Sequence, residues 1–496
     1  MNIVKLILHY QKRGIKLSIV DGKLHFSASQ NALTNEDKNI LKKYKAQIVE
    51  YLLNNSESEI IVDKEGKYNE FPLTDIQSSY LVGQNNIYKF GGTNCKIYAE
   101  IEFEELILKK AQKAWEEVIK CNDMLHAIIE KNGVQRILKI YNVPQIAYTD
   151  LSKKSDVQSI LYNKRMRLTK KKYKVGTWPL FDVEISKLQD RYIFHISLDM
   201  LIADFVSINL ILDEFEQMYY TGKINSKSEL SFRDVVIYRE NIKNTVDEKD
   251  KYERDKKYWL KKIDTMPEAP QFPIIELQNE EVEFTQYKVF LKIAQYDKLC
   301  KIANYYRVTV SSIILTVYAE ALKQISKNKN FCIDVTMANR PPLHPDMNKI
   351  VGDFTVANIL EINDDEGDTY LARVKNIQKR LWDDLSHNSF SSREVLREMG
   401  KKTKGEFIVP AVYTSTLGAV EYNKKRGKIL YTLSQTPQVL IDCQVLEIEK
   451  ELRLNWDVRD AAFPNGLIKE AFEYFCDLIY QIIDVNSLKI PICPKL

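Results

Sequence analysis

The sequence lacks several features that would assign a function directly. Its 496 residues contain no apolar run of about 18 residues, so no transmembrane helix is predicted. Neither the phosphate-binding pattern G-x4-G-K-[ST] nor the dinucleotide pattern G-x-G-x-x-G occurs, and no nucleotide cofactor is therefore indicated. The net charge is only +4, from 72 Lys and Arg and 68 Asp and Glu residues, which does not predict a nucleic-acid partner.

Cysteine usage gives no sign of cross-links. The seven cysteines are dispersed and none has C-x2-C spacing, which argues against a disulfide framework or a zinc site. An odd, dispersed set is typical of a reducing compartment, so we expect a cytoplasmic protein without a bound metal. The segment 1–10 is apolar but short and is interrupted by Lys5, and it predicts an amphipathic helix and not a signal peptide.

The first residues have the pattern of a small separate domain. An Asp-Gly pair separates two alternating runs, 15–20 and 23–26, which predicts a β-hairpin. One helix is expected before the hairpin and another after it, the second opening with a capping sequence at 34–37. We therefore predict an α-β-β-α domain over residues 1–55, followed by a polar linker over 56–70. The apolar positions of the two helices are Ile3, Leu6 and Ile7, then Ile40, Leu41, Tyr44, Ile48 and Leu52.

Residues 71–496 alternate between helical and strand patterns and are predicted to form an α/β domain. The charge-rich stretch 241–256 falls near the middle and is predicted to join two lobes, 71–240 and 257–496. With 45% hydrophobic and 28% charged residues, the composition is that of an ordinary folded protein.

The stretch Asp199-Met-Leu-Ile-Ala-Asp204-Phe-Val-Ser207 carries two carboxylates at the end of an apolar strand, 192–198. Carboxylates at such a position are costly to bury unless each has a partner or a chemical task. Asp204 lies where the strand gives way to a helix, and Ser207 is a candidate cap for that helix. His195 is expected to be a strand residue and not a catalytic base.

This Asp-x4-Asp-x2-Ser pattern resembles the core motif of heterocyclization domains in nonribosomal peptide synthetases. Ordinary condensation domains of the same superfamily carry His-His-x3-Asp-Gly at this place, and here Asp199 and Met200 stand where the two histidines would be. Because a methionine cannot move a proton, the histidine-based chemistry of the wider superfamily is not expected in this chain.

Further stretches match the heterocyclization family in its order and extend the resemblance over residues 68–490. The second family motif is altered, since Cys121-Asn122 replaces its usual Arg-His. Each motif alone would be weak, but their common order makes the resemblance specific. The clearest matches are Phe71-Pro-Leu-Thr-Asp-Ile-Gln77, Asn339-Arg-Pro-Pro342, Val351-Gly-Asp-Phe-Thr355, Tyr413-Thr-Ser-Thr416, Gln435-Thr-Pro-Gln-Val439 with Asp442, and Trp456-Asp457 with Phe463-Pro464.

The resemblance implies a two-lobed α/β pseudodimer like chloramphenicol acetyltransferase, with a tunnel between the lobes and a small docking domain in front. In this fold the aspartate that matches Asp204 pairs with an arginine, for which Arg340 is the candidate. The residues tied to cyclization in the family correspond to Asp442 and Thr414. The candidates for lining the tunnel are Ser415, Asn339 and Trp456.

Asp442 is also an acid–base candidate on its own pattern. It follows the apolar strand 439–441, and Gln444 is expected to point to the same face, where it could orient Asp442 or bind a substrate carbonyl. A carboxylate in a partly dry tunnel has a raised pKa and can both accept and return a proton. Without the resemblance, plain strand packing explains Thr414 and Ser415.

The resemblance implies a reaction that joins an acyl thioester to Cys, Ser or Thr, both delivered on the phosphopantetheine arms of carrier proteins. Ring closure with loss of water then gives a thiazoline or oxazoline. No bound cofactor, nucleic acid or membrane is expected. The alternatives are a condensation enzyme that does not cyclize, a non-catalytic docking scaffold, and an acyltransferase using coenzyme A, which the missing His at position 200 disfavours.

The resemblance also implies a partner for residues 1–55, the C-terminal segment of a preceding synthetase subunit, which often adds a strand to the hairpin. This stretch contains nine Lys or Arg and four Asp or Glu residues, so the segment is expected to be acidic. Composition alone favours the solvated face of a small helical domain. No adenylation or carrier region follows Phe463, which leaves open a piece of a larger synthetase or a free-standing member.

Overall fold

The computed structural model describes residues 6, 10, 16–20, 23–27, 35–54, 60–225, 228–275, 282–365, 367–418 and 427–492. Near the N-terminus, β1 (Lys16–Val20) and β2 (Lys23–Ser27) pair in antiparallel register, which confirms the predicted hairpin. The helix expected after it is interrupted at Tyr44, with α2 spanning Asn35–Lys43 and α3 spanning Lys45–Asn54.

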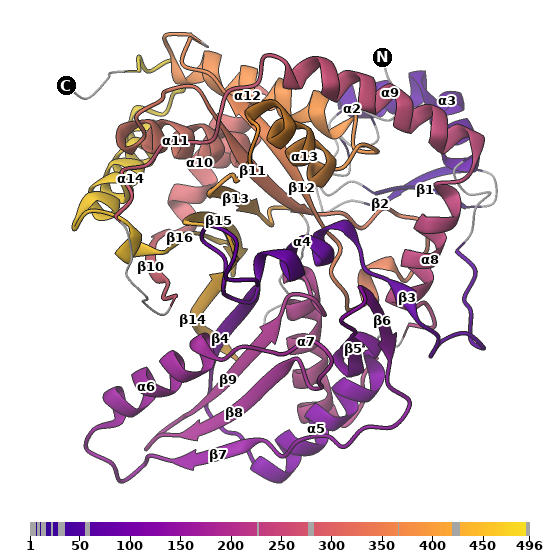
Figure 1. Ribbon diagram of the computed structural model, residues 1–496, viewed down its shortest axis with the longest axis vertical. Coiled ribbons are helices and arrows are strands. Elements are labelled where there is room, and N and C mark those ends of the chain that lie inside the picture. The colour runs from indigo at the N-terminus through magenta and orange to yellow at the C-terminus, as the bar shows by residue number, and fades with distance from the viewer. Residues whose placement is uncertain are drawn as a thin grey trace.

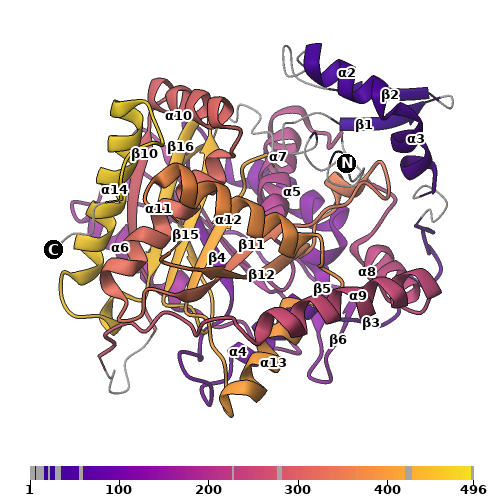
Figure 2. The same ribbon diagram turned by 90° about the horizontal axis from the view of Figure 1, so that it is seen from above.

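The helix predicted before the hairpin and the capping residue Thr34 lie outside the described residues, apart from Leu6 and Tyr10. These two side chains are buried together with Leu17, Leu41 and Ile48 in a small core of their own. Figure 2 shows the hairpin with α2 and α3 at one side of the larger unit. A small separate core is what allows so short a segment to hold its shape.

The N-terminal lobe is built on a five-stranded sheet in the order β14-β4-β9-β8-β7. Its apolar face packs on α5 and α7, and α6 lies over the other, more polar face. A smaller sheet, β3-β6-β5, adjoins it. The bounds are β3 Phe71–Pro72, α4 Asp75–Gly83, β4 Lys96–Phe103, α5 Leu108–Cys121, β5 Ala127–Ile129, β6 Val134–Ile137, β7 Ala147–Asp150, α6 Val157–Lys170, β8 Phe181–Lys187, β9 Tyr192–Asp199, α7 Phe205–Thr221 and α8 Phe232–Ile242.

The C-terminal lobe is built on a six-stranded sheet in the order β10-β16-β15-β13-β11-β12, in which β13 runs parallel to both β11 and β15. Helices α10, α11, α12 and α14 cover its apolar face (Figure 2). The bounds are β10 Thr285–Leu291, α10 Ile293–Tyr306, α11 Val310–Ile325, β11 Phe331–Ala338, β12 Thr355–Ile362, α12 Tyr370–Leu385, α13 Ser392–Thr403, β13 Ala411–Ser415, β15 Ile441–Ile448, β16 Glu451–Val458 and α14 Leu467–Val485.

One strand crosses between the lobes. β14 (Lys428–Gln435) lies within the stretch predicted as the C-terminal lobe, yet it pairs with β4 at the edge of the N-terminal sheet. The predicted joint, 241–256, is mostly helical, because Thr245 caps α9 (Val246–Ile263). Figure 1 shows the two sheets one above the other, with β14 reaching down from the upper lobe. The predicted two-lobed α/β architecture is confirmed, with this exchanged strand as an addition.

Among the described helices, no single one is both long and apolar enough to cross a membrane. Only α10 and α11 taken together, bent by 99° at their junction, reach the required length and hydropathy.

Candidate active site

The six-stranded sheet has one apolar and one polar face. Residues such as Val335, Tyr413, Cys443 and Trp456 pack in the core beneath α11 and α14. The residues between them face the other way, because successive side chains of a strand alternate. Strand register sets polar residues side by side on this second surface, which we call the polar face. One row is Thr336, Thr414, Gln444 and Asn455, and the other contains Asp334, Asp442, Asp457 and Gln286.

Asp442 lies in the middle of the polar face and is held by two neutral donors. The Thr414 hydroxyl donates to its Oδ1 at 2.9 Å, and the Gln444 amide donates to its Oδ2 at 2.9 Å. A further hydroxyl, from Thr336, lies 2.8 Å from that of Thr414. The structure thus brings together the three residues predicted to be catalytic, although their chemical roles remain a prediction.

Burial dominates the electrostatics of Asp442. It raises the pKa of this carboxyl from 3.8 to about 6, against the opposing effect of the Gln444 and Thr414 hydrogen bonds. No Lys or Arg of the described residues forms an ion pair with it. A carboxyl that titrates close to neutral pH can accept a proton in one step and return it in the next.

Asp457 faces Asp442 directly across the β15–β16 pair. It accepts hydrogen bonds from the Gln444 amide at 3.0 Å, from the backbone N–H of Ser434 at 2.7 Å and from the Gln286 amide at 2.8 Å. Burial raises its pKa to about 8, and the neighbouring Asp442 adds to that rise. Two carboxyls therefore share the amide of one glutamine.

The core motif supplies a different kind of carboxylate. The Arg340 guanidinium donates to Asp204 at 2.8 and 3.1 Å, as the resemblance implied. The same arginine donates to the backbone carbonyls of Met347 and Ile350 at 3.1 and 2.7 Å. The pair is almost completely buried and ties the start of α7 to the loop before β12. This arrangement is architectural, because it fixes both charges in place.

The helix cap in this motif differs from the prediction. Asp204, and not Ser207, is the N-cap of α7, and its carboxylate accepts from the Ser207 backbone N–H at 2.7 Å. The Ser207 hydroxyl oxygen instead lies 2.6 Å from the Asp204 carboxylate and 2.8 Å from the Gly352 carbonyl, either of which can take its one proton, and it accepts from the Gly352 N–H at 3.0 Å. Asp204 is the cap because it is the last residue with extended backbone before the helix begins.

Asp199 is fully buried at the end of β9. Its carboxylate accepts from the Asn94 amide at 2.9 Å and from the Leu201 backbone at 3.0 Å, opposite Lys96 on β4. Burial raises its pKa to about 7. Met200 packs against the apolar core of this lobe. In the described core motif, no hydrogen bond brings another side chain to the place where a histidine at position 200 would act as a base.

His195 is a buried strand residue, in agreement with the sequence-based expectation. Its ring nitrogens lie 2.8 Å from the Tyr98 hydroxyl and 3.0 Å from the Ser186 hydroxyl. Burial lowers its pKa to about 3, so the ring is neutral. A neutral imidazole held between two hydroxyls serves packing and hydrogen bonding.

The three tunnel candidates fall in different places. Asn339 follows β11 and lines a cavity between the lobes. Trp456 does not lie where it was predicted: it is fully buried on the apolar face, against Tyr318 and Phe475. Ser415 points away from Thr414 and interacts with Tyr413 on that same apolar side. Strand alternation explains both corrections, since these residues adjoin polar-face positions in sequence.

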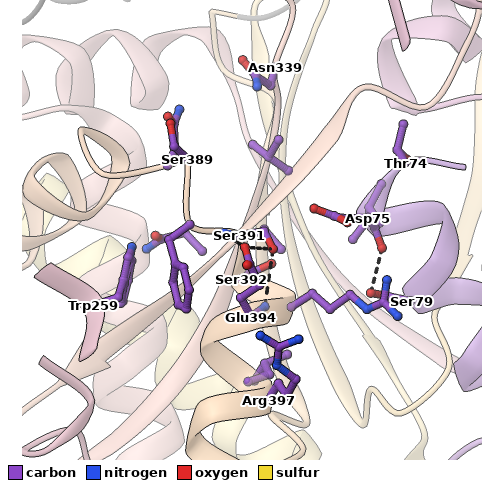
Figure 3. Close-up of a pocket in the computed structure, with 18 of the residues that line it drawn as sticks. Thr74, Asp75, Ser79, Trp259, Asn339, Ser389, Ser391, Ser392, Glu394 and Arg397 are labelled. Carbon is purple, nitrogen blue, oxygen red and sulfur yellow. Dashed lines mark hydrogen bonds between the residues drawn. The ribbon is translucent and has the colours of Figure 1, made fainter. Parts of the chain in front are cut away.

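The cavity has a volume of about 2060 Å³ and opens between α4, α8, α9, α13 and β12. Figure 3 shows Asp75 and Ser79 of α4 on one side, Glu394 and Arg397 of α13 on the other, and Asn339 at the top of the view. Basic side chains outnumber acidic ones along its lining. The cavity reaches Met337, the residue next to Thr336, but Asp442 itself is not part of its wall.

Sequence reasoning missed Asp457 and Thr336 as parts of the site. The signal for Asp457 was present, because Leu452, Leu454, Trp456 and Val458 alternate with polar residues in β16. That alternation assigns Trp456 and Asp457 to opposite faces. Among the described residues, no group of three or more His, Cys, Asp or Glu side chains is arranged to hold a metal ion.

Comparison with protein families identifies the class of this chain. A family model described as a condensation domain matches residues 67–490, and one described as a TubC N-terminal docking domain matches residues 3–53. Since the first match covers most of the sequence, the chain belongs to the condensation-domain family.

Individual relatives sharpen this assignment. Pyochelin synthetase PchF of Pseudomonas aeruginosa is 28% identical over 97% of this chain, and phenyloxazoline synthase MbtB of a Mycobacterium species is 28% identical over 82% of it. Of solved structures, the cyclization-docking bidomain of EpoB from Sorangium cellulosum superposes with a TM-score of 0.82 at 25% identity, covering 97% of this chain and 98% of that one. The chain spans 27% of the length of PchF and 34% of that of MbtB.

Proposed function

We propose that residues 71–496 condense a carrier-bound acyl or peptidyl thioester with carrier-bound Cys, Ser or Thr and then cyclodehydrate the product to a thiazoline or oxazoline. One observation carries the proposal: a buried carboxyl, Asp442, is held by Thr414 and Gln444, with no Lys or Arg ion partner in the described part of the chain. Similarity to a cyclization-docking bidomain and to a phenyloxazoline synthase supports the same reaction.

The condensation step requires mainly proximity. The amine of the acceptor attacks the donor thioester carbonyl, the amide C–N bond forms, and the donor carrier leaves as a thiol. Two thioesters held in one water-poor passage react as if at high effective concentration. No histidine is needed for that contribution, which agrees with Met200 at the place of the usual candidate base.

Cyclodehydration needs a proton acceptor that becomes a donor. The Asp442 carboxylate takes the proton of the attacking thiol or hydroxyl as the new C–S or C–O bond forms, and it returns this proton to the former amide oxygen. When the resulting hydroxyl leaves as water, the amide N–H gives up its proton and the C=N bond forms. The water carries the amide oxygen and these two protons, so Asp442 ends as it began.

Thr414 and Gln444 act on the same carboxyl. Their hydrogen bonds favour the ionised form and limit how far burial raises its pKa, which keeps Asp442 available as a base near neutral pH. Both side chains also fix the direction in which the carboxyl oxygens point. Asn339, at the cavity wall, is the proposed contact for the arriving substrate arm.

The cavity is the proposed entrance for one phosphopantetheine arm. Such arms are carried by the partner carrier proteins, and a rim with an excess of Lys and Arg complements their phosphodiester and an acidic carrier surface. Residues 1–55 are the proposed docking domain for the C-terminal segment of an upstream synthetase subunit. Their excess of basic residues favours an acidic segment.

The test uses two loaded carriers. An upstream carrier bearing an aminoacyl group and a downstream carrier bearing cysteine are mixed with the wild-type protein or with Asp442→Ala, and the downstream carrier is followed by intact mass. The wild type should give a condensed product that has lost one water. The variant should give a condensed product that keeps it.

Asp460→Ala serves as a matched control. Asp460 lies just after β16, and its carboxylate accepts from the Tyr287 hydroxyl at 2.9 Å and makes no contact with Asp442 among the described hydrogen bonds. It should cyclize like the wild type. Condensation without water loss in the wild type would reduce the function to amide formation. No condensation with any acyl donor would favour a docking scaffold.

The docking proposal is tested separately with the full chain. A synthetic peptide with the C-terminal sequence of the upstream subunit is titrated by calorimetry at low and high salt. Binding that weakens as salt rises supports an acidic segment on a basic surface. Absence of binding at low salt would contradict it, whatever the outcome of the carrier assay.

A further inference from the structure

We propose that Asp457 is a positioning residue for dehydration: through the Gln444 amide it fixes the orientation of the Asp442 carboxyl, and, as an acid opposite an acid, it keeps one proton within the pair. This inference rests on the proposed cyclodehydration and concerns a residue that does not contact the reacting atoms. Its support is the register, the hydrogen bonds and the surroundings of the two carboxyls.

The register places the two carboxyls face to face. Asp442 and Asp457 are direct partners across the antiparallel strands β15 and β16. Like charges at such positions repel each other strongly when buried, and neither carboxyl has a Lys or Arg ion partner among the described residues. The low-energy state therefore carries one negative charge and one proton over the two groups.

The Gln444 side chain links the two acids. An amide group has two N–H donors, and here its nitrogen serves Asp442 at 2.9 Å and Asp457 at 3.0 Å. Flipping the amide would turn its carbonyl oxygen toward the ionised Asp442, which is repulsive. The second N–H, donated to Asp457, holds the Gln444 side chain in place, and Gln444 in turn holds Oδ2 of Asp442.

Asp457 is itself anchored to the other lobe. Ser434, whose backbone N–H donates to Asp457 at 2.7 Å, belongs to β14, the strand that pairs with the N-terminal sheet. Gln286 of β10 donates to the second oxygen at 2.8 Å and also to the carbonyl of Thr432 on β14. Hydrogen bonds through Gln444 and Asp457 therefore connect Asp442 to β14, and β14 in turn pairs with the sheet of the N-terminal lobe.

The groups around the pair support a shared proton. Asp334 on β11 lies in the same row as Asp442, beyond Val412, and the Asp442 charge contributes to raising the Asp334 pKa. Tyr431 on β14 lies near Asp457. Burial raises the pKa of Asp442 to about 6 and that of Asp457 to about 8. Between these values Asp442 is ionised and Asp457 is neutral, which is the state that a base at Asp442 requires.

The test compares wild type with Asp457→Asn, starting from the condensed, uncyclized product on its carrier. Asparagine keeps the size of the side chain but cannot ionise. The variant should dehydrate at least ~10-fold more slowly, on the scale of one misplaced general base, while its condensation rate stays within about twofold. The wild-type rate should fall above a pH of about 8, where Asp457 ionises, and this alkaline limb should vanish in the variant.

Asp460→Asn is the matched control, because Asp460 lies just after β16 and its carboxylate accepts from the Tyr287 hydroxyl at 2.9 Å, outside the cluster of Asp442, Gln444 and Asp457. It should keep the wild-type profile. Gln286→Leu is a milder second variant that leaves Asp457 in place with one donor fewer, so the alkaline limb should move to higher pH. In an infrared titration without substrate, the difference between wild type and Asp457→Asn at pH 7 should be one protonated carboxyl, on a background of other buried carboxyls such as Asp199 that both proteins share.

Three results would overturn the proposal. These are an alkaline limb that is the same in wild type and Asp457→Asn, dehydration at the wild-type rate in that variant, or an equal loss of condensation, dehydration and thermal stability. A wild-type protein that condenses but never loses water would refute the proposed function instead. The infrared titration separates the two cases, because it needs no turnover.

Discussion

The two lobes each contribute a buried aspartate, and the partners of these two carboxyls differ in kind. Asp204 of the N-terminal lobe meets the Arg340 guanidinium at 2.8 Å. Among the described residues, the hydrogen bonds to Asp442 of the C-terminal lobe come from the hydroxyl of Thr414 and the amide of Gln444. A guanidinium keeps its proton at any physiological pH, so it fixes the opposing charge, whereas neutral donors leave the proton of the carboxyl free to move.

The difference teaches how one residue type serves two purposes in one fold. A buried ion pair costs desolvation energy and returns it only with good geometry, and breaking it leaves a lone buried charge. A buried carboxyl without a neighbouring cation has a raised pKa, so it can gain or lose its proton near neutral pH. We therefore expect that breaking the Asp204–Arg340 pair mainly lowers stability. Removing the Asp442 carboxyl should mainly slow dehydration and change stability little.

The largest effect is expected for Arg340→Leu. The substitution leaves Asp204 buried without its partner and removes the donors to Met347 and Ile350. The free energy of unfolding should fall by about 3–5 kcal/mol, and condensation and cyclization should fall together as the fold is lost. Urea unfolding followed by circular dichroism measures this change.

An exposed ion pair provides the control for Arg340→Leu. Lys349 pairs with Asp346 at 2.7 Å near the same loop, but its side chain is 45% exposed. Lys349→Ala should cost less than ~1 kcal/mol, as surface pairs generally do. Should Arg340→Leu unfold like the wild type and lose only cyclization, the Asp204 pair would belong to the chemistry and the comparison would fail.

The next largest effect is expected for Asp442→Asn, which should slow dehydration by about 10²–10⁴-fold and leave condensation nearly unchanged. The folded-state pKa is raised from 3.8 to about 6, so the folded protein holds this proton more tightly than the unfolded chain does. The wild type therefore loses stability as the pH rises from about 4 to about 6, and the variant lacks that loss.

Two measurements check the Asp442→Asn prediction. Intact-mass analysis of the carrier separates the condensed product from the dehydrated one, and thermal unfolding between pH 4 and pH 8 compares the two proteins. The wild-type dehydration rate should rise with pH through about 6, because only the ionised form accepts a proton. A variant that dehydrates normally would exclude Asp442 as the base.

Local patterns in the sequence predicted much of the fold and part of the site. The Asp-Gly pair correctly predicted the hairpin, because such a two-residue turn joins two adjacent antiparallel strands directly. The spacing of Asp442 and Gln444 placed both on one face, since strand side chains alternate. The Asp204–Arg340 contact came from family resemblance, because no local rule joins residues so distant in sequence.

The remainder depends on strand order, which local patterns do not encode. Thr336 reaches Thr414 only because β11 and β13 are parallel neighbours. Asp457 receives the Ser434 N–H only because β14 leaves its own lobe and crosses over. The misplacement of Trp456 was avoidable, because the alternation of β16 already separates it from Asp457.

A smaller effect is expected for Thr414→Val, which removes one hydrogen bond to Asp442 and keeps the shape of the side chain. Loss of this donor removes an influence that lowers the pKa of Asp442, so the acidic limb of the dehydration profile should move to higher pH. At neutral pH the rate should fall about 10-fold, the value expected for one hydrogen bond to a charged group. An unshifted limb would show that Thr414 contacts the substrate and not the base.

The smallest effect is expected for Ser415→Ala, which follows Thr414 directly. Ser415 interacts with Tyr413 on the apolar side of β13, so its hydroxyl is separated from Asp442 by the sheet itself. Its removal should change the dehydration rate by less than about twofold and leave the pH profile in place, in the range typical of a substitution away from the site. The two hydroxyls are adjacent in sequence but lie on opposite faces of the sheet. Equal effects of Ser415→Ala and Thr414→Val would therefore contradict the assignment of the reaction to the polar face. A larger effect of Thr414→Val would assign proton transfer to the face on which Asp442 lies.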